Sequence, residues 1–159
     1  MKKVPEDFKD RKICIIGLGY VGLTLAAVMS EVGFEIIGIE NNLEILSKIK
    51  KGESHFYEPR LNDILRKQIK NGNLKFFEKI PVDLESSVFI LTVGTPLNEE
   101  GIVRLDMVDK AIDEISKCKI NDQLIVMRST LKLGTTRKIY QKLKERNINL
   151  DIAFCPERT

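Results

Sequence analysis

Residues 13–22 read Ile-Cys-Ile-Ile-Gly-Leu-Gly-Tyr-Val-Gly, and this stretch decides the fold. Four apolar residues in a row predict a buried strand, and three glycines follow it at once with the spacing G-x-G-x-x-G. Apolar residues then recur at helical spacing from Val21 to Val32, and Gly33 ends that helix. A strand, a glycine turn and a helix in this order are typical of a dinucleotide-binding βαβ unit.

Each part of the turn has its own expected task. Gly17 permits the tight turn out of the strand, and Gly19 has no side chain, so that a pyrophosphate can approach the backbone. Gly22 lets the helix pack closely on the sheet. Tyr20 and Val21 open the helix, whose unpaired N–H groups and positive dipole end attract phosphate. These five residues are the predicted pyrophosphate site.

Two alternatives exist for the glycines. Gly17 to Gly22 also fits the G-x-x-x-x-G of a nucleoside-triphosphate loop, but that loop needs Lys next and Leu23 stands there. A surface turn with incidental glycines is the other alternative. The strand before the turn and the helix after it favour the dinucleotide interpretation.

Glu40 supplies the second half of the pattern. It follows the predicted strand at residues 35–39, and it lies 18 residues beyond Gly22, where an acidic side chain can accept hydrogen bonds from the adenosine ribose. A carboxylate there repels a 2′-phosphate, and neither Asn41 nor Asn42 supplies a cation to attract one. The residues therefore predict NAD rather than NADP, with a solvated strand end as the alternative role of Glu40.

Strand and helix patterns alternate along the rest of the chain. Further strands are predicted at residues 35–39, 74–77, 88–91, 123–127 and 150–154, and further helices at residues 43–49, 59–69, 105–115 and 136–146. Lys75 and Glu78 place the strand at 74–77 towards an edge of the sheet. Continuous apolar strands between amphipathic helices predict an α/β fold, a doubly wound parallel sheet of the Rossmann type that fills residues 1–159 as one domain.

Composition excludes several classes of function. The chain has 26 Lys and Arg and 23 Asp and Glu, so its formal net charge is +3. This positive charge is too small to indicate a nucleic-acid-binding protein. It has no Trp and three Tyr, which disfavours a carbohydrate platform of stacked aromatic rings. The N-terminus lacks the apolar core of a signal peptide, and no apolar run is long enough to span a bilayer. We therefore expect a cytoplasmic protein without membrane contacts.

The cysteines do not form a metal-binding pattern. Cys14, Cys118 and Cys155 are far apart in sequence, and His55 is the only histidine. A structural zinc site needs ligands clustered in pairs, so we expect no metal and three reduced thiols.

Five segments together resemble the UDP-glucose/GDP-mannose dehydrogenase family, whose members oxidise nucleotide sugars to uronic acids. The matching segments are Gly19-Tyr20-Val21-Gly22-Leu23, Gly52 through Glu58-Pro59 and Leu61, Val93-Gly94-Thr95-Pro96, Arg128-Ser129-Thr130 with Gly134-Thr135-Thr136, and Cys155-Pro156-Glu157-Arg158. Leu131 and Leu133 depart from the usual Val and Pro, and Glu40 replaces the commoner Asp.

The resemblance implies roles for four residues. Thr130 belongs to the active site, where it holds a catalytic water or the reacting oxygen beside the cofactor, and Glu157 orients or deprotonates the water that hydrolyses a thioester. Thr95 contacts the nicotinamide half of NAD, and Arg158 helps Glu157 to bind the sugar nucleotide. The motif Cys-Pro-Glu-Arg-Thr is similar to the one in the branch of the family that acts on UDP-N-acetylhexosamines, such as UDP-N-acetylmannosamine. UDP-glucose is the alternative substrate.

The resemblance also implies parts that this sequence does not contain. Family members continue into a central helix, through which a homodimer is expected, and into a nucleotide-sugar domain with the catalytic cysteine, a lysine and an asparagine. Cys155 does not match that cysteine, so we expect the 159 residues alone to bind NAD without turnover. Two rivals remain open: another Rossmann dehydrogenase, of the 6-phosphogluconate or 3-hydroxyacyl-CoA type, and a non-enzymatic NAD-binding regulatory module.

Overall fold

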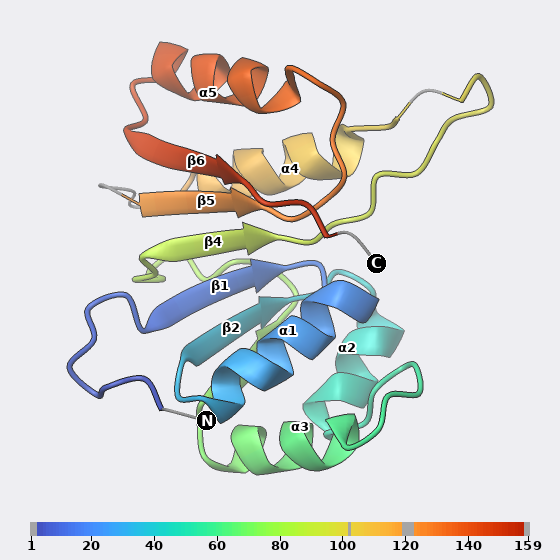
Figure 1. The fold of residues 1–159 in the computed structure, drawn as a ribbon, viewed down its shortest axis with the longest axis vertical. Helices are drawn as coiled ribbons and strands as arrows, with labels where there is room; N and C mark the ends of the chain where they lie inside the picture. The colour runs from blue at the N-terminus through green and yellow to red at the C-terminus, as the bar shows by residue number, and fades with distance from the viewer. Residues whose placement is uncertain (1–2, 102, 119–122, 158–159) are drawn as a thin grey trace.

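The computed structural model describes residues 3–101, 103–118 and 123–157, and strands and helices alternate through them (Figure 1). The strands are β1 Lys12–Ile16, β2 Glu35–Ile39, β3 Leu74–Phe77, β4 Val88–Leu91, β5 Gln123–Met127 and β6 Leu150–Phe154. The helices are α1 Tyr20–Glu31, α2 Leu43–Lys50, α3 Leu61–Lys70, α4 Asp106–Ile115 and α5 Thr135–Glu145.

All six strands are parallel and form one sheet in the order β3-β2-β1-β4-β5-β6. The chain moves outward from β1 to β3, returns to the centre at β4 and then moves outward on the other side. This is the strand order of the dinucleotide-binding doubly wound fold, and the order reverses between β1 and β4. The predicted fold class is therefore confirmed, and β3 lies at the predicted edge.

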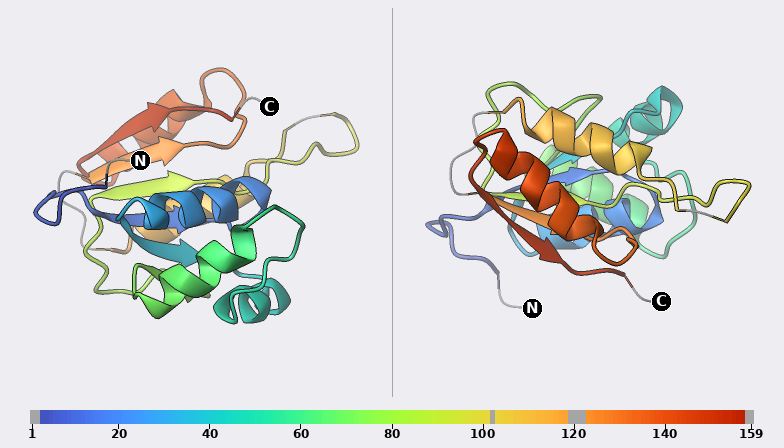
Figure 2. Two further views of the ribbon diagram at one scale, coloured as in Figure 1. Left: turned by 60° about the horizontal axis from the view of Figure 1, so that its bottom comes forward. Right: turned by 90° about the horizontal axis from the view of Figure 1, so that it is seen from above.

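The sheet separates two apolar layers because successive strand residues point to opposite faces. Ile13 and Ile15 of β1 pack with α1, α2 and α3, whereas Cys14 and Ile16 pack with α4 and α5. The two views in Figure 2 show the helices distributed over both sides of the sheet. Because both faces of the central strands are covered, their sequences are continuously apolar rather than alternating.

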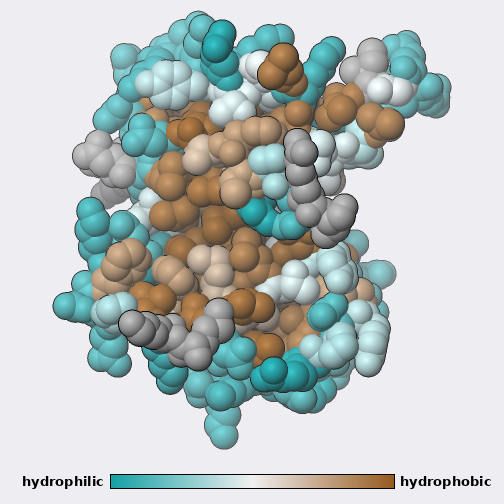
Figure 3. Space-filling view, viewed as in Figure 1, coloured by the Kyte–Doolittle hydropathy of each residue, from teal (hydrophilic) through white to brown (hydrophobic). Residues whose placement is uncertain are grey.

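One part of the sheet is less covered. Helix α1 lies over β1 and β2, so the same face of β4 and β5 has no helix of the described chain in front of it (Figure 1). Val88 and Val126 are only partly buried there, and Val28 of α1 is 44% exposed. Figure 3 shows the resulting apolar band between α1 and α5.

Two helix starts show how local sequence sets the boundaries. The side chain of Asn42 accepts hydrogen bonds from the backbone N–H groups of Glu44 and Ile45, which is the usual way a side chain caps a first turn. Helix α3 begins at Leu61, two residues after Pro59, where the sequence pattern placed its start. Arg60 stands between them with a left-handed backbone (φ 65°), and this turn delays the helix.

The three cysteines lie in different environments and none is in a disulfide. Cys14 is fully buried in the sheet, and burial strongly raises the pKa of its thiol. Cys118 is partly buried and Cys155 is exposed. Within the described ranges, no group of three His, Cys, Asp or Glu side chains is arranged to hold a metal ion, and no helix is long and apolar enough to cross a membrane.

Candidate cofactor site

The glycine turn lies where strand order reverses, between the carboxyl ends of β1 and β4. Gly17 has φ +89°, a left-handed backbone conformation that is strained for residues with a side chain. A Cβ atom at this position would also lie 3.1 Å from the backbone of Thr92. The hydroxyl of Thr92 donates a hydrogen bond to the carbonyl of Gly17 at 2.6 Å. The turn is thus fixed against the end of β4, and sequence reasoning did not identify Thr92 as its anchor.

The first turn of α1 is open to an anion. Gly19 is the N-cap residue, no side chain caps the helix, and no acidic residue lies in its first turn. A Cβ atom placed on Gly19 would meet no protein atom within 4 Å, so the space beside its backbone is empty of protein. Unpaired N–H groups at a helix start, next to a residue without a side chain, fit a pyrophosphate group. The helix start therefore has the open space and uncapped first turn that a pyrophosphate site requires.

A cavity of about 270 Å³ adjoins this turn. It lies between the carboxyl ends of β1, β2 and β4 and helix α4. Its lining comprises Ile16, Gly17, Gly19, Ile39, Glu40, Asn41, Glu78, Thr92, Val93, Gly94, Asp106, Met107, Lys110, Ala111 and Glu114. A crevice outside the carboxyl ends of parallel strands, at the point where their order reverses, is the general ligand site of open α/β sheets.

Glu40 lies at one wall of this cavity and is only 8% exposed. Its two carboxylate oxygens accept backbone hydrogen bonds, one from Leu18 at 3.0 Å and one from Asn42 at 2.9 Å. A carboxylate has about four acceptor positions, so about two remain for the hydroxyl groups of a ribose. Glu40 therefore also holds the glycine turn to the end of β2, a role that the sequence pattern did not indicate.

Tyr20 lies at the start of α1, but its side chain does not line the cavity. The ring packs 4.8 Å from the ring of Phe56, and the hydroxyl donates a hydrogen bond to Glu58 at 2.9 Å, which raises the pKa of Tyr20. Tyr20 thus joins the glycine turn to the segment before α3. Its backbone N–H, together with that of Val21, is what it offers at the helix start.

The loops after β4 and β5 are tied together. The hydroxyl of Thr95 donates a hydrogen bond to the carbonyl of Thr130 at 2.9 Å. The hydroxyl of Ser129, which is 8% exposed, donates to the carbonyl of Val93 at 2.7 Å. The structure thus brings the two predicted threonines into contact at the carboxyl edge of the sheet, and Ser129 is the buried residue that fixes this arrangement.

Glu157 follows β6 and is paired with Arg128, a residue of a matching segment to which the sequence assigned no role. Arg128, directly after β5, forms an ion pair with the Glu157 carboxylate and also contacts the sulfur of Cys155 at 3.4 Å. The backbone N–H of Glu157 donates to the carbonyl of Arg128 at 3.2 Å. The pairing of β5 with β6 creates this arrangement, so only strand order could have indicated it. Arg158, the remaining predicted site residue, lies outside the described residues.

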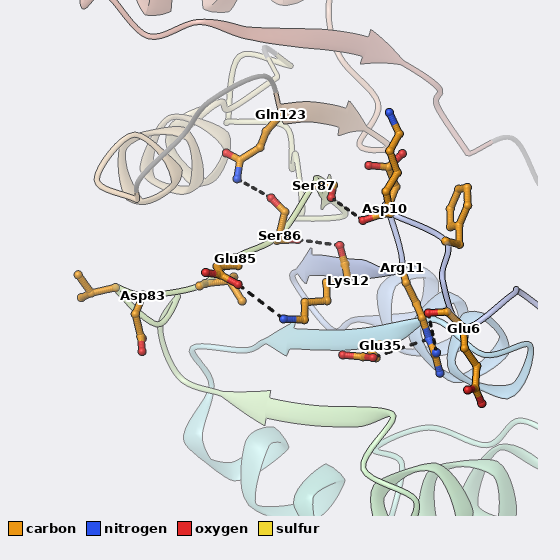
Figure 4. Close-up of a pocket in the computed structure, with 14 residues that line it drawn as sticks. Glu6, Asp10, Arg11, Lys12, Glu35, Asp83, Glu85, Ser86, Ser87 and Gln123 are labelled. Atoms are coloured by element: carbon orange, nitrogen blue, oxygen red, sulfur yellow. Dashed lines mark hydrogen bonds and ion pairs between the residues drawn. The ribbon is translucent and has the colours of Figure 1, made fainter.

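A larger hollow of about 780 Å³ lies at the opposite, amino edge of the sheet (Figure 4). Four of its charged side chains form two pairs: Lys12 lies 3.8 Å from Glu85, and Arg11 lies 3.7 Å from Glu35. Arg11 also donates to the backbone carbonyl of Gly33 at 2.8 Å. This hollow contains neither the glycine turn nor a helix start, so size alone does not make it the cofactor site.

Comparison with known proteins agrees with this geometry. Residues 11–159 match the NAD binding domain of the UDP-glucose/GDP-mannose dehydrogenase family. The chain belongs to this family. The match covers nearly the whole chain and both halves of the sheet, and it indicates NAD as the cofactor of the domain.

Individual relatives give the same result. UDP-N-acetyl-D-mannosamine dehydrogenase of Methanocaldococcus jannaschii is 36% identical over 161 residues, which is 99% of this chain and 37% of that protein. The solved UDP-D-ManNAc dehydrogenase of Pyrococcus horikoshii has a TM-score of 0.86 and 29% identity over 93% of this chain and 36% of that one. GDP-mannose dehydrogenase of Pseudomonas aeruginosa has a TM-score of 0.83 and 28% identity over 92% of this chain and 36% of that one.

The chain spans about a third of the length of these relatives. Family membership excludes one of the two rival interpretations, a Rossmann dehydrogenase of the 6-phosphogluconate or 3-hydroxyacyl-CoA type, but it does not test the other, a non-enzymatic NAD-binding regulatory module. It leaves the substrate, and the activity of a whole protein, to be proposed.

Proposed function

We propose that these residues are the cofactor-binding part of a nucleotide-sugar 6-dehydrogenase, which oxidises a UDP-sugar to its uronic acid in two NAD-dependent steps. The observation that carries the proposal is the open glycine turn beside a cavity walled by Glu40, in a chain that belongs to this family. Bound NAD supplies the hydride acceptor for both oxidations.

We propose a UDP-N-acetylhexosamine as the substrate, with UDP-glucose as the alternative. The Cys155-Pro156-Glu157-Arg158 wording supports the first, as do relatives named as UDP-N-acetyl-D-mannosamine dehydrogenases at 36% and 35% identity. A relative named as a putative UDP-glucose 6-dehydrogenase, from Bacillus subtilis, is 32% identical, which keeps the alternative in view.

The chain's own residues would contribute binding, orientation and proton handling. The N–H groups at Tyr20 and Val21 hold the pyrophosphate, and Glu40 accepts from the adenosine ribose. Thr95 and Thr130, joined by their hydrogen bond, face the nicotinamide end and the reacting oxygen. Glu157 orients or deprotonates the hydrolytic water, and its ion pair with Arg128 fixes the position of the carboxylate.

Three further proposals rest on the resemblance alone. Arg158 takes part with Glu157 in binding the sugar nucleotide. A central helix forms a homodimer in a whole protein of this family. The protein works in the cytoplasm.

NADH formation by the whole protein that carries these residues tests the proposal. With a UDP-N-acetylhexosamine and NAD we expect two NADH for each sugar oxidised, whereas the 159 residues alone should bind NAD without steady NADH formation. Glu157→Gln should lower kcat by about a hundredfold, because the amide cannot take up a proton. Glu145→Gln, an exposed change on α5, is the matched control and should leave kcat unchanged.

Two results would contradict the proposal. One is a whole protein that binds NAD but oxidises no UDP-sugar. The other is steady turnover by the 159 residues alone, which would place the catalytic nucleophile within them.

A further inference from the structure

Glu78 lies beside Glu40 at the carboxyl edge of the sheet. In the pairing of β2 with β3, Ile39 is in register with Phe77, and the backbone N–H of Glu40 donates to the carbonyl of Phe77 at 3.0 Å. Glu40 and Glu78 are therefore the next residues on two adjacent strands. Adjacent strands lie about 4.8 Å apart, so two carboxylates leave the sheet next to each other.

Glu40 and Glu78 both line the cavity beside the glycine turn, but their surroundings differ. Glu40 is buried and its oxygens hold two backbone N–H groups. Glu78 is exposed and makes no hydrogen bond or ion pair with a described residue. Glu78 therefore contributes its charge to the cavity without a structural role in the turn.

We propose that Glu78 is a second cofactor-specificity residue, which acts with Glu40 to exclude dinucleotides that carry a 2′-phosphate. The inference rests on the proposed function, since it takes the cavity as the adenosine site of a bound dinucleotide. A ribose with free hydroxyl groups can donate to carboxylates, whereas a 2′-phosphate near neutral pH is mostly a dianion that both carboxylates repel. Two like charges on one wall also repel more strongly than the single Glu40 of the sequence pattern.

The other charges around the cavity do not cancel this pair. Lys110, on α4, is the one basic side chain among the described lining residues. Its charge acts on Asp106, whose pKa is held below the ordinary value mainly by hydrogen bonds from Arg104 and further by Lys110. Glu114 adds another carboxylate on the same helix. The cavity therefore favours an uncharged ribose edge over a phosphorylated one.

The test is calorimetric titration of the chain and of Glu78→Gln and Glu78→Lys with NAD and with NADP, which differ only in the 2′-phosphate. We expect Glu78→Gln to narrow the ratio of the NADP and NAD dissociation constants about tenfold and Glu78→Lys about a hundredfold, because each step changes one charge near the phosphate. The change should come from tighter NADP binding, with NAD affinity altered less than about threefold. Glu145→Gln is the control for an exposed charge outside the cavity.

Salt dependence distinguishes an electrostatic role from a structural one. The ratio of the NADP and NAD dissociation constants should differ less between the parent chain and Glu78→Gln as ionic strength rises, because exposed charges are screened. If the parent chain fails to bind NAD, the proposed function is wrong whatever the variants do. If the parent chain binds NAD and both variants leave the ratio unchanged, the role of Glu78 is overturned and the proposed function stands.

Discussion

Gly19→Val is expected to abolish NAD binding while the fold stays intact. The backbone of Gly19 is extended, with φ −66° and ψ −164°, which a Val residue can adopt without strain. No protein atom lies within 4 Å of a Cβ atom at this position, so the larger side chain has room in the free protein. It fills the space in which we place the pyrophosphate, and binding should weaken by at least about a hundredfold.

Calorimetry with NAD measures this loss, and chemical denaturation measures the fold. The free energy of unfolding should change by no more than about 1 kcal/mol, the usual scale for a poor residue at a helix N-cap. Normal NAD affinity in a folded Gly19→Val variant would mean that the pyrophosphate lies elsewhere. Gly19→Ala should give a smaller loss of affinity, because a methyl group occupies less of the same space.

Gly22→Ala is expected to damage the fold itself. A Cβ atom at Gly22 would lie 1.9 Å from the carbonyl oxygen of Gly17 and 2.6 Å from the hydroxyl of Thr92. The carbonyl belongs to the turn backbone, so α1 must move away from β1 and β4 to accommodate one methyl group. Overpacking of this kind costs about 3 kcal/mol of unfolding free energy, and NAD binding should be lost with it.

Denaturant titration of Gly22→Ala against Val28→Ala provides the comparison. Val28 is on the same helix but is 44% exposed, so its truncation should cost less than about 1 kcal/mol. A Gly22→Ala variant as stable as the parent would contradict the close approach of α1 to the glycine turn. The two glycines thus have different roles: Gly19 leaves space for a ligand, and Gly22 allows α1 to pack against the glycine turn.

The fold could be predicted from the sequence because buried parallel strands leave a direct signal. The apolar runs at residues 35–39, 88–91, 123–127 and 150–154 coincide with β2, β4, β5 and β6 as they stand in the structure. Helix ends were less predictable. The start of α3 depends on the left-handed turn at Arg60, and a charged, non-glycine residue gives no local sign of such a conformation.

The site was only partly predictable, for a related reason. Gly17, Gly19, Gly22 and Glu40 are found by spacing, because one continuous βαβ segment fixes them. Glu78 and Arg128 depend on which strands are neighbours. Glu78 comes next to Glu40 only because β3 lies beside β2, and Arg128 pairs with Glu157 only because β6 lies beside β5. The direction of a side chain was also not predictable: Tyr20 is the first residue of α1, yet its hydroxyl donates to Glu58 outside the cavity.

The central claim is that this domain binds NAD at the glycine turn and that the acidic residues lining the adjacent cavity favour NAD over NADP. Calorimetric titration of the unmodified chain with the two cofactors, at one ionic strength, tests this claim most directly. We predict saturable one-to-one NAD binding with a dissociation constant at least about tenfold below that for NADP, because Glu40 and the cavity around it repel a 2′-phosphate. Equal or tighter binding of NADP, or no NAD binding by a folded chain, would contradict the account.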